Sequence, residues 1–199
     1  MKTKLTKSNH NITKVKKDNI KIARTRRQRG YHWEDTLVKR FNSLIDWKAF
    51  RLGSPSVALP DILAVSTKNS TIFTIEAKSG TTNSLVVPFD QVQRCLRWVN
   101  TFELYNTRKV VFAFKFLSKK RIGLGQYEKR ELREYYKVWN TSQEPVDFAC
   151  NYDGTTYLLS GGKRERIDLA DYRMPFNTRH AKTTEIPMPK IANPQQLFN

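Results

Sequence analysis

The chain has 199 residues, enough for one domain with additional terminal segments. It carries 36 Lys and Arg against 18 Asp and Glu, a net charge of +18, which predicts a polyanionic partner, either nucleic acid or an anionic membrane. No apolar run of about 18 residues could span a bilayer and no secretory signal opens the chain, so we expect a cytoplasmic protein. Cys95 and Cys150 lie in apolar contexts without CxxC spacing, so we expect reduced core residues and neither a zinc site nor a disulfide.

The basic character is strongest at the start of the chain. Residues 1–30 carry eleven Lys and Arg and one acid, Asp18, with few apolar residues and no sustained periodicity. We therefore expect residues 1–25 to form a disordered basic arm, which is either simply solvated or contacts phosphates without reading sequence. The candidate phosphate contacts at the end of this segment are Arg24, Arg26, Arg27 and Arg29.

A helix is predicted from Gly30 to about Ile45 because apolar residues recur there at spacings of three and four. These residues are Trp33, Leu37, Phe41, Leu44 and Ile45. Glu34 lies on the border of this stripe, where the ordinary role of a carboxylate is a surface ion pair. A strand over residues 47–52 and a loop of turn-forming residues, 53–56, follow.

Two β-like runs, residues 62–65 and 71–78, are joined by a short polar turn and predict a hairpin. Asp61 stands at the start of the first run. In the second run, Glu76 and Lys78 share one face because side chains alternate along a strand. Two carboxylates and one ammonium would therefore converge at one edge of a sheet.

A second helix should start near Phe89, because Pro88 suits a helix start and an apolar face follows. Gln91 in its first turn would point back toward the sheet edge. Residues 109–116 are nearly all apolar and predict a buried strand. This order of elements predicts a compact α/β domain over residues 26–117, whose last strand is parallel to the preceding one.

Residues 118–176 are expected to form an extension packed on this core. The charged run 127–139 predicts a helix, and residues 148–159 predict a hairpin around Asp153-Gly154. Residues 167–176 could dock back on the core, and residues 177–199 should form a loose tail. The basic run of Lys119, Lys120 and Arg121 is either a solvated face or a further DNA contact.

The converging polar residues suit phosphodiester hydrolysis, which needs a metal ion, a hydroxide source and accurate positioning. Magnesium and manganese prefer oxygen ligands, so Asp61, Glu76 and the carbonyl of Ala77 are candidate ligands. Lys78 could orient or deprotonate the attacking water and stabilise charge on the phosphorus. Glu34 could complete the site as a further ligand of the metal or the water.

Six short motifs carry a resemblance to a known family. They are Arg29-Gly30, Glu34-Asp35-Thr36-Leu37-Val38, Arg51-Leu52-Gly53-Ser54, Pro60-Asp61-Ile62, Ile75-Glu76-Ala77-Lys78 and Val87-Pro88-Phe89-Asp90-Gln91. In order and spacing they resemble an archaeal Holliday junction resolvase of the PD-(D/E)xK nuclease superfamily, over residues 26–117. The resemblance implies a restriction-endonuclease-like core with a mixed central sheet flanked by helices. It further implies a magnesium-dependent homodimer, with manganese as a substitute, that cuts four-way DNA junctions in recombination and repair in an archaeal cytosol or nucleoid.

The resemblance also implies roles for individual residues. Asp61 and Glu76 would be metal ligands, Lys78 the catalytic lysine and Glu34 the helix carboxylate of the site. The other implied site residues are Ser54 (or Ser56) as the loop serine near the scissile phosphate and Gln91 as the glutamine of the second helix. Arg51 and Ser54 join the basic clusters as expected DNA contacts.

Three functions fit these residues. The first is a metal-dependent, structure-selective DNA endonuclease. The second is a restriction-like or repair nuclease that acts on duplex or flap DNA, which the core motifs do not separate from the first. The third is a non-catalytic basic nucleic-acid-binding protein, although carboxylates at a DNA-facing edge would repel phosphate and serve no purpose in a pure binder.

Overall fold

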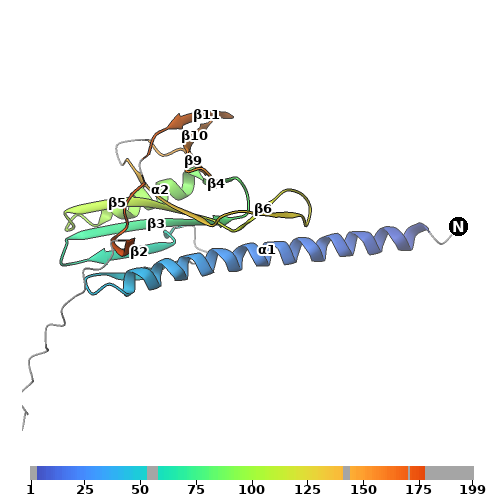
Figure 1. Ribbon diagram of the computed structural model, residues 1–199, viewed down its shortest axis with the longest axis horizontal. Helices are drawn as coiled ribbons and strands as arrows, with labels where there is room; N and C mark the ends of the chain where they lie inside the picture. Colours follow the sequence, from blue (N-terminus) through green and yellow to red (C-terminus); the bar gives the residue numbers. More distant parts are fainter. Residues whose placement is uncertain (1–3, 53–57, 141–143, 170, 178–199) are drawn as a thin grey trace, which may run out of the picture.

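The computed structural model describes residues 4–52, 58–140, 144–169 and 171–177, with side chains from residue 20 onward except Lys21 (Figure 1). Its centre is a five-stranded sheet in the order β1-β2-β3-β5-β8. These strands are β1 (Lys48–Arg51), β2 (Ile62–Ser66), β3 (Thr71–Gly80), β5 (Thr107–Phe116) and β8 (Arg133–Trp139). The helices are α1 (Lys4–Asn42), α2 (Phe89–Thr101) and the short 3-10 helix η1 (Pro175–Asn177).

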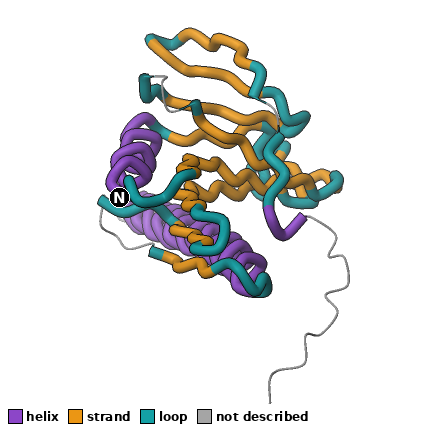
Figure 2. The backbone as a smooth tube through the Cα atoms, turned by 90° about the vertical axis from the view of Figure 1, so that its left-hand side faces the viewer, coloured by secondary structure: helices purple, strands orange, loops and turns teal. Residues whose placement is uncertain are grey.

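The central sheet is mixed. β1, β2 and β3 form an antiparallel meander, and β5 returns through α2 to pair in parallel with β3, as the order of elements predicted. β8 then pairs antiparallel with the other edge of β5. Together with a helix on each face of the sheet (Figure 2), this pairing confirms the predicted α/β class.

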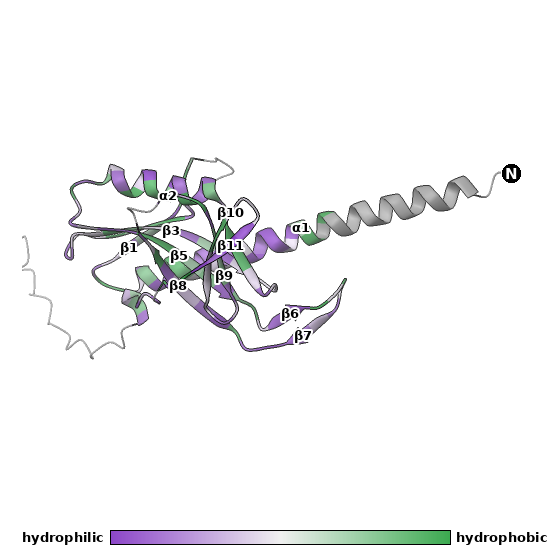
Figure 3. Cartoon of the chain, turned by 90° about the horizontal axis from the view of Figure 1, so that it is seen from above, coloured by the Kyte–Doolittle hydropathy of each residue, from purple (hydrophilic) through white to green (hydrophobic). Residues whose placement is uncertain are grey.

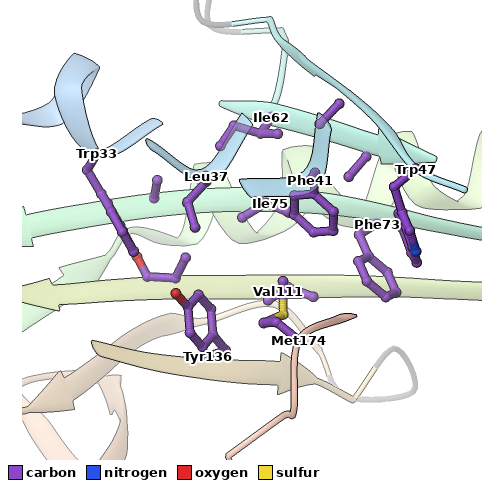
Figure 4. Close-up of a cluster of buried hydrophobic side chains, with 14 of the residues drawn as sticks. Trp33, Leu37, Phe41, Trp47, Ile62, Phe73, Ile75, Val111, Tyr136 and Met174 are labelled. Atoms are coloured by element: carbon purple, nitrogen blue, oxygen red, sulfur yellow. The ribbon is translucent and has the colours of Figure 1, made fainter. Parts of the chain in front are cut away.

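Two hydrophobic cores lie on opposite faces of the sheet, because side chains alternate along β3 and β5. On one face Trp33, Leu37 and Phe41 of α1 point toward the sheet, as Figure 4 shows. On the other face Val92, Cys95, Leu96 and Val99 of α2 pack with the alternate strand residues. Hydrophobic residues accordingly concentrate in the strands of the central sheet (Figure 3). Cys95 and Cys150 are both buried there, as expected of core residues.

A second sheet, in the order β11-β10-β9-β4, extends the core on the α2 side. Its strands are β4 (Ser84–Val87), β9 (Asp147–Asn151), β10 (Thr156–Ser160) and β11 (Lys163–Ile167). The predicted hairpin around Asp153-Gly154 is confirmed, with a positive φ of 87° at Gly154. A small projecting hairpin completes the set of strands, with β6 (Lys119–Arg121) and β7 (Tyr127–Lys129).

The helix predicted over residues 127–139 is wrong, because this run forms β7 and β8. Its aromatic residues matched a helical spacing, but aromatic and β-branched side chains also favour strands. The free edge of β5 decides between the two, since β8 pairs with it from Val110 to Phe116 and buries Tyr136 and Trp139. A contact between distant parts of the chain therefore overrides the local pattern.

The first helix begins far earlier than predicted. α1 runs from Lys4, so the segment that was expected to be a disordered arm (1–25) is helical from that residue. Residues 4–29 contain no Pro or Gly and many Lys and Arg, which are good helix formers. The absence of an apolar stripe misled the prediction, since this part of α1 extends beyond the sheet and has no core to face (Figure 1).

The last described segment packs on the core, as predicted for residues 167–176. Met174 is fully buried, and Tyr172 and Phe176 pack against the same core cluster, on the face that α1 covers. The expected tail, residues 177–199, lies outside the described residues from residue 178 onward. No helix in the described ranges is long and apolar enough to cross a membrane.

Candidate active site

The candidate site lies where β3 continues past the end of β2. β2 pairs with β3 only as far as Ile62 opposite Ile75, whereas β3 continues to Gly80 with β5 as its neighbour. Pro60 precedes β2 and cannot donate a further ladder hydrogen bond. Residues 76–80 therefore leave one edge of β3 open, and the predicted residues gather at this edge.

Asp61 takes the place of a strand partner at the open edge. Its Oδ2 accepts a hydrogen bond of 2.8 Å from the backbone N–H of Ala77, the first amide beyond the β2 ladder on that side. Its own carbonyl accepts from the N–H of Leu52 at 2.9 Å, which ties the residue to the end of β1. The Pro-Asp step thus ends the β2 pairing and turns a carboxylate toward Ala77.

Glu76 is a buried carboxylate held between two cations. Its side chain is 1% exposed; Oε1 accepts from Lys78 Nζ at 2.7 Å and Oε2 accepts from Arg94 at 2.9 Å. An unpaired charge at such a depth would be strongly destabilising, so both contacts stabilise the buried carboxylate. Lys78 is more exposed than Arg94, so its ammonium lies on the open side of the pair.

Arg94 is the site residue that sequence reasoning missed. It is buried in α2 between Val92 and Cys95, and the charge of Glu76 keeps its pKa above the ordinary value although burial acts in the opposite direction. A cation within the apolar face of an amphipathic helix needs a buried anion as a partner. The position of Arg94 between Val92 and Cys95 is the signal in the sequence that points to such a partner.

Glu34 approaches the site from α1. It is buried, at 7% exposure, and its Oε2 has no hydrogen-bond partner among the described residues. Burial raises its pKa, with smaller increases from Glu76 and Asp35, while Arg51 and Lys78 act to lower it. Gly30, one turn earlier in α1, leaves the space beside the carboxylate open, since a Cβ there would lie 3.7 Å from Oε1. Glu34 thus brings to the site a buried carboxylate oxygen, Oε2, that accepts no hydrogen bond from the described residues.

Asp61 shares the negative surroundings of Glu34 and Glu76. Burial raises the pKa of Asp61 to about 7, and the charges of Glu76 and Glu34 add to the rise. Lys78 and the N–H of Ala77 oppose it without cancelling it. A nearby cation would lower this pKa and favour the ionised carboxylates, so the site has the electrostatics of a cation-binding site.

The residues fit a hard divalent cation by their donor chemistry. Asp61, Glu76 and the partnerless oxygen of Glu34 offer the oxygen ligands that magnesium and manganese prefer. Among the described residues, however, no three His, Cys, Asp or Glu side chains are close enough to hold a metal ion by themselves. A magnesium ion here would therefore depend on one or two carboxylates together with water and substrate phosphate oxygens, which is its usual coordination in phosphoryl-transfer sites.

Two of the remaining predicted residues, Gln91 and Arg51, lie on elements that border the candidate site. Gln91 is one turn before Arg94 on α2, and its Oε1 is buried without a partner in the described part of the chain. Arg51 pairs with Asp35 at 3.3 Å and lies over the ring of Tyr31, on the Glu34 side of the site. Ser54 and Ser56 both fall outside the described residues.

The predicted phosphate contacts form a separate group beyond the carboxyl end of β3. On α1, Arg24, Arg26 and Arg27 are exposed and Arg29 is partly buried. In the β6–β7 hairpin, Lys119 is exposed and Lys120 pairs with Glu128 at 3.8 Å. Arg121 lines the same cleft as Arg26 and Arg29. The basic clusters of two distant segments are therefore neighbours in space.

Comparisons with known proteins add a structural likeness. No protein-family model matches the chain, and no curated protein matches it. Among solved structures, it is similar to Hjc, a Holliday junction resolvase of the archaeal hyperthermophile Archaeoglobus fulgidus, with 16% identity and a TM-score of 0.42. That likeness covers 63% of this chain and 85% of the other. What the chain does is therefore judged from its own residues.

Proposed function

We propose that this protein is a metal-dependent endonuclease that hydrolyses phosphodiester bonds in branched DNA. The observation that supports hydrolysis best is the buried Glu76, paired with Lys78 and Arg94 beside Asp61 at the open edge of β3. A protein that only binds DNA gains nothing from acidic groups at such an edge, because they repel phosphate. A hydrolase needs them, together with a cation and a positioned water.

The residues of the site divide the work. One or two of the carboxylates of Asp61, Glu76 and Glu34, together with water and phosphate oxygens, would hold magnesium, or manganese in its place. The ion, when bound, would offset charge on the phosphate and make its water a stronger nucleophile. Lys78, on the open side of Glu76, would orient the attacking water and donate to a phosphate oxygen. Arg94, behind Glu76, is a positioning residue that fixes the carboxylate.

DNA is the proposed substrate because of charge and shape. The net charge of +18 and the arginines of α1 favour a polyanion, and contacts to phosphates carry no sequence information by themselves. We propose a four-way junction as the branched substrate because the order and spacing of the six motifs resemble those of the resolvase family. A homodimer suits that substrate, since two sites related by a two-fold axis can nick two symmetric strands.

The test is cleavage of a mobile four-way junction with magnesium or with EDTA. We expect magnesium-dependent nicks by the wild type, and a rate lower by a factor of at least about 100 for Lys78→Ala, because a proton-transfer or water-orienting group is lost. Junction affinity should be retained. The matched control is Lys68→Ala, which removes an exposed lysine that pairs with Asp46 far from the site and should cleave normally.

Each negative outcome has a distinct meaning. If the wild type binds the junction but never cleaves it with magnesium or manganese, the protein is a binder and the proposal is wrong. Equal cleavage of junction, flap and linear duplex would instead contradict the selectivity for branched DNA and leave a duplex nuclease. Light scattering of the free protein and of its junction complex tests the dimer.

A further inference from the structure

A cleft of about 480 Å³ opens directly beyond the candidate active site. One wall is α1 and the opposite wall is the β6–β7 hairpin, and both extend beyond the body of the protein (Figures 1 and 3). The floor includes Ser79 and Gly80, the two residues that follow Lys78 on β3. A polymer bound at the open edge of β3 would therefore continue into this cleft.

The walls carry two kinds of side chain. Arg26 and Arg29 from α1 face Arg121 from β6, and none of the described residues that line the cleft is acidic. Beside these arginines lie the apolar side chains of Leu124 and Tyr127 from the hairpin and Ile22 from α1. Leu124 is 87% exposed and Tyr127 is 47% exposed. Large apolar groups that project from a thin hairpin contribute little to its own folding, so they point to a ligand with apolar surface.

This combination favours an unpaired nucleic-acid strand over a paired one. In a duplex the base faces are stacked and hidden. A duplex would therefore contact the arginines through its phosphates but would make no contact with the apolar side chains. An unpaired nucleotide offers a phosphate to an arginine and an open base face to an aromatic or aliphatic side chain. The cleft has both partners within one space.

We infer that the cleft between α1 and the β6–β7 hairpin binds an unpaired stretch of the DNA substrate next to the scissile phosphate. Arg26, Arg29 and Arg121 contact its phosphates, and Tyr127 and Leu124 contact its bases. This inference rests on the proposed nuclease function and deepens it, because it assigns the preference for branched DNA to unpaired nucleotides at the branch.

Two other occupants fit the charges or the shape less well. A second copy of the same face would place arginines against arginines, with no acidic side chain on the described lining to oppose them. An anionic membrane would meet the apolar side chains and the cations, but it is a flat surface and cannot enter a cleft that leads to buried carboxylates. Each of these occupants corresponds to a measurable outcome below.

The test measures binding by fluorescence anisotropy in EDTA, so that cleavage plays no part. The probes are a linear duplex, a forked duplex with unpaired arms of about eight nucleotides, and the same fork with abasic arms. The two forks have equal phosphates and differ in their bases alone. The wild type should bind the normal fork about tenfold more tightly than the abasic fork.

The variants then locate the base contact. The double variant L124S/Y127S should bring this ratio close to one while it keeps its affinity for linear duplex. L104S is the matched control, because Leu104 is 94% exposed in the loop after α2, away from the cleft, and its ratio should equal that of the wild type. R26A should weaken binding to both forks equally, since it removes a phosphate contact.

Several results would overturn the inference. A wild type that binds the normal and abasic forks equally would do so, as would an L124S/Y127S variant that keeps the wild-type ratio. Loss of self-association in this variant, measured by sedimentation, would indicate that a second copy occupies the cleft. Loss of its binding to vesicles with anionic lipid would indicate a membrane. Because both residues are exposed, circular dichroism should show the variant folded. The nuclease proposal fails separately: the protein would then bind the normal fork more tightly than the abasic fork but would not cleave DNA.

Discussion

Single residues around Glu76 control the charge balance of the site. The carboxylate is buried, each of its oxygens meets a cation, and two further carboxylates raise the local negative potential. Removing a cation should therefore act on stability even in the absence of substrate. Removing the charge of Asp61 should act in the opposite direction. Both effects can be measured on the metal-free protein.

We expect Arg94→Met to lower the free energy of unfolding by about 1–3 kcal/mol, because Oε2 of Glu76 loses a charged hydrogen bond in a buried position. Lys78 remains, so the loss should be smaller than that for a buried charge left with no partner. Urea denaturation in EDTA measures it. Arg97→Met, an exposed position one turn along α2, is the control and should change stability by less than about 0.5 kcal/mol. Equal stability of the two variants would show that the Glu76 contact contributes nothing.

The raised pKa of Asp61 predicts a pH-dependent stability. The pKa is 3.8 in an ordinary setting and about 7 in the folded protein, so between these values the folded state holds a proton that the unfolded chain has lost. The free energy of unfolding should therefore fall as pH rises from about 4 to 7 in EDTA. Below about pH 4 Asp61 is protonated in both states and does not change the free energy of unfolding. Above about pH 7 its full destabilising contribution is present.

Asp61→Asn should remove this pH dependence, because the amide oxygen still accepts from Ala77 but carries no charge. The variant should match the wild type near the acidic end of the window and exceed it in stability near neutral pH. Asp46→Asn, at a surface acid paired with Lys68, is the control. A wild-type stability that rises through the window would contradict the assigned pKa. Magnesium should bind more tightly as pH rises toward 7, since protons and metal compete for the same oxygens.

At the scale of elements, α1 has two parts, one that packs on the sheet and one that projects beyond it. The part from Trp33 onward buries an apolar face on the sheet and brings Glu34 to the site. The part before it carries basic residues past the edge of the sheet and forms one wall of the arginine cleft. A helix of 39 residues spans about 58 Å, so it extends well beyond the candidate site.

Deleting residues 1–19 should lower DNA affinity without lowering stability. The deletion removes six lysines, so DNA affinity should fall and its dependence on salt should weaken by up to about 0.9 in log–log slope for each phosphate that the shortened helix no longer neutralises. The free energy of unfolding should be unchanged because the buried face of α1 lies further along. Replacing the six lysines with glutamine in the full chain should reproduce the result if charge is the cause. Unchanged affinity at low salt would show that this part of α1 does not touch DNA.

At the scale of the whole molecule, the segment after residue 117 is part of the main fold. β8 forms an edge of the central sheet, and Trp139 and Phe148 pack against Phe112 of β5 with ring centroids 5.7 Å and 5.1 Å apart. Met174 fills the opposite core. The two cores share the strands β3 and β5.

A fragment of residues 1–117 is therefore expected to remain unfolded, although the resemblance to the nuclease family ends near that residue. Without β8 and β9 it exposes the edge of β5 and a large apolar surface. The full chain should unfold in one cooperative transition, with tryptophan fluorescence and far-ultraviolet circular dichroism superimposing in urea. A folded, soluble fragment, or two separate transitions, would show that residues 26–117 form an independent domain.

Features that depend on neighbours along the chain could be predicted from the amino-acid sequence. The alternation of side chains on β3 predicted that Glu76 and Lys78 share a face, and their contact at 2.7 Å agrees with it. The Pro60-Asp61 step predicted a carboxylate at the start of β2, and the spacing of Val92 to Val99 predicted the buried face of α2. These features follow from backbone periodicity, which needs no knowledge of distant contacts.

Features that depend on distant partners emerged only in the folded molecule. Arg94 became a site residue because α2 packs over Glu76, and residues 133–139 became a strand because β5 offered a free edge. The arginine cleft brings together Arg26 and Arg121, which are far apart in sequence. The cause is the same in each case: a buried charge, an open strand edge and a cleft are properties of surfaces that meet only after the chain has folded.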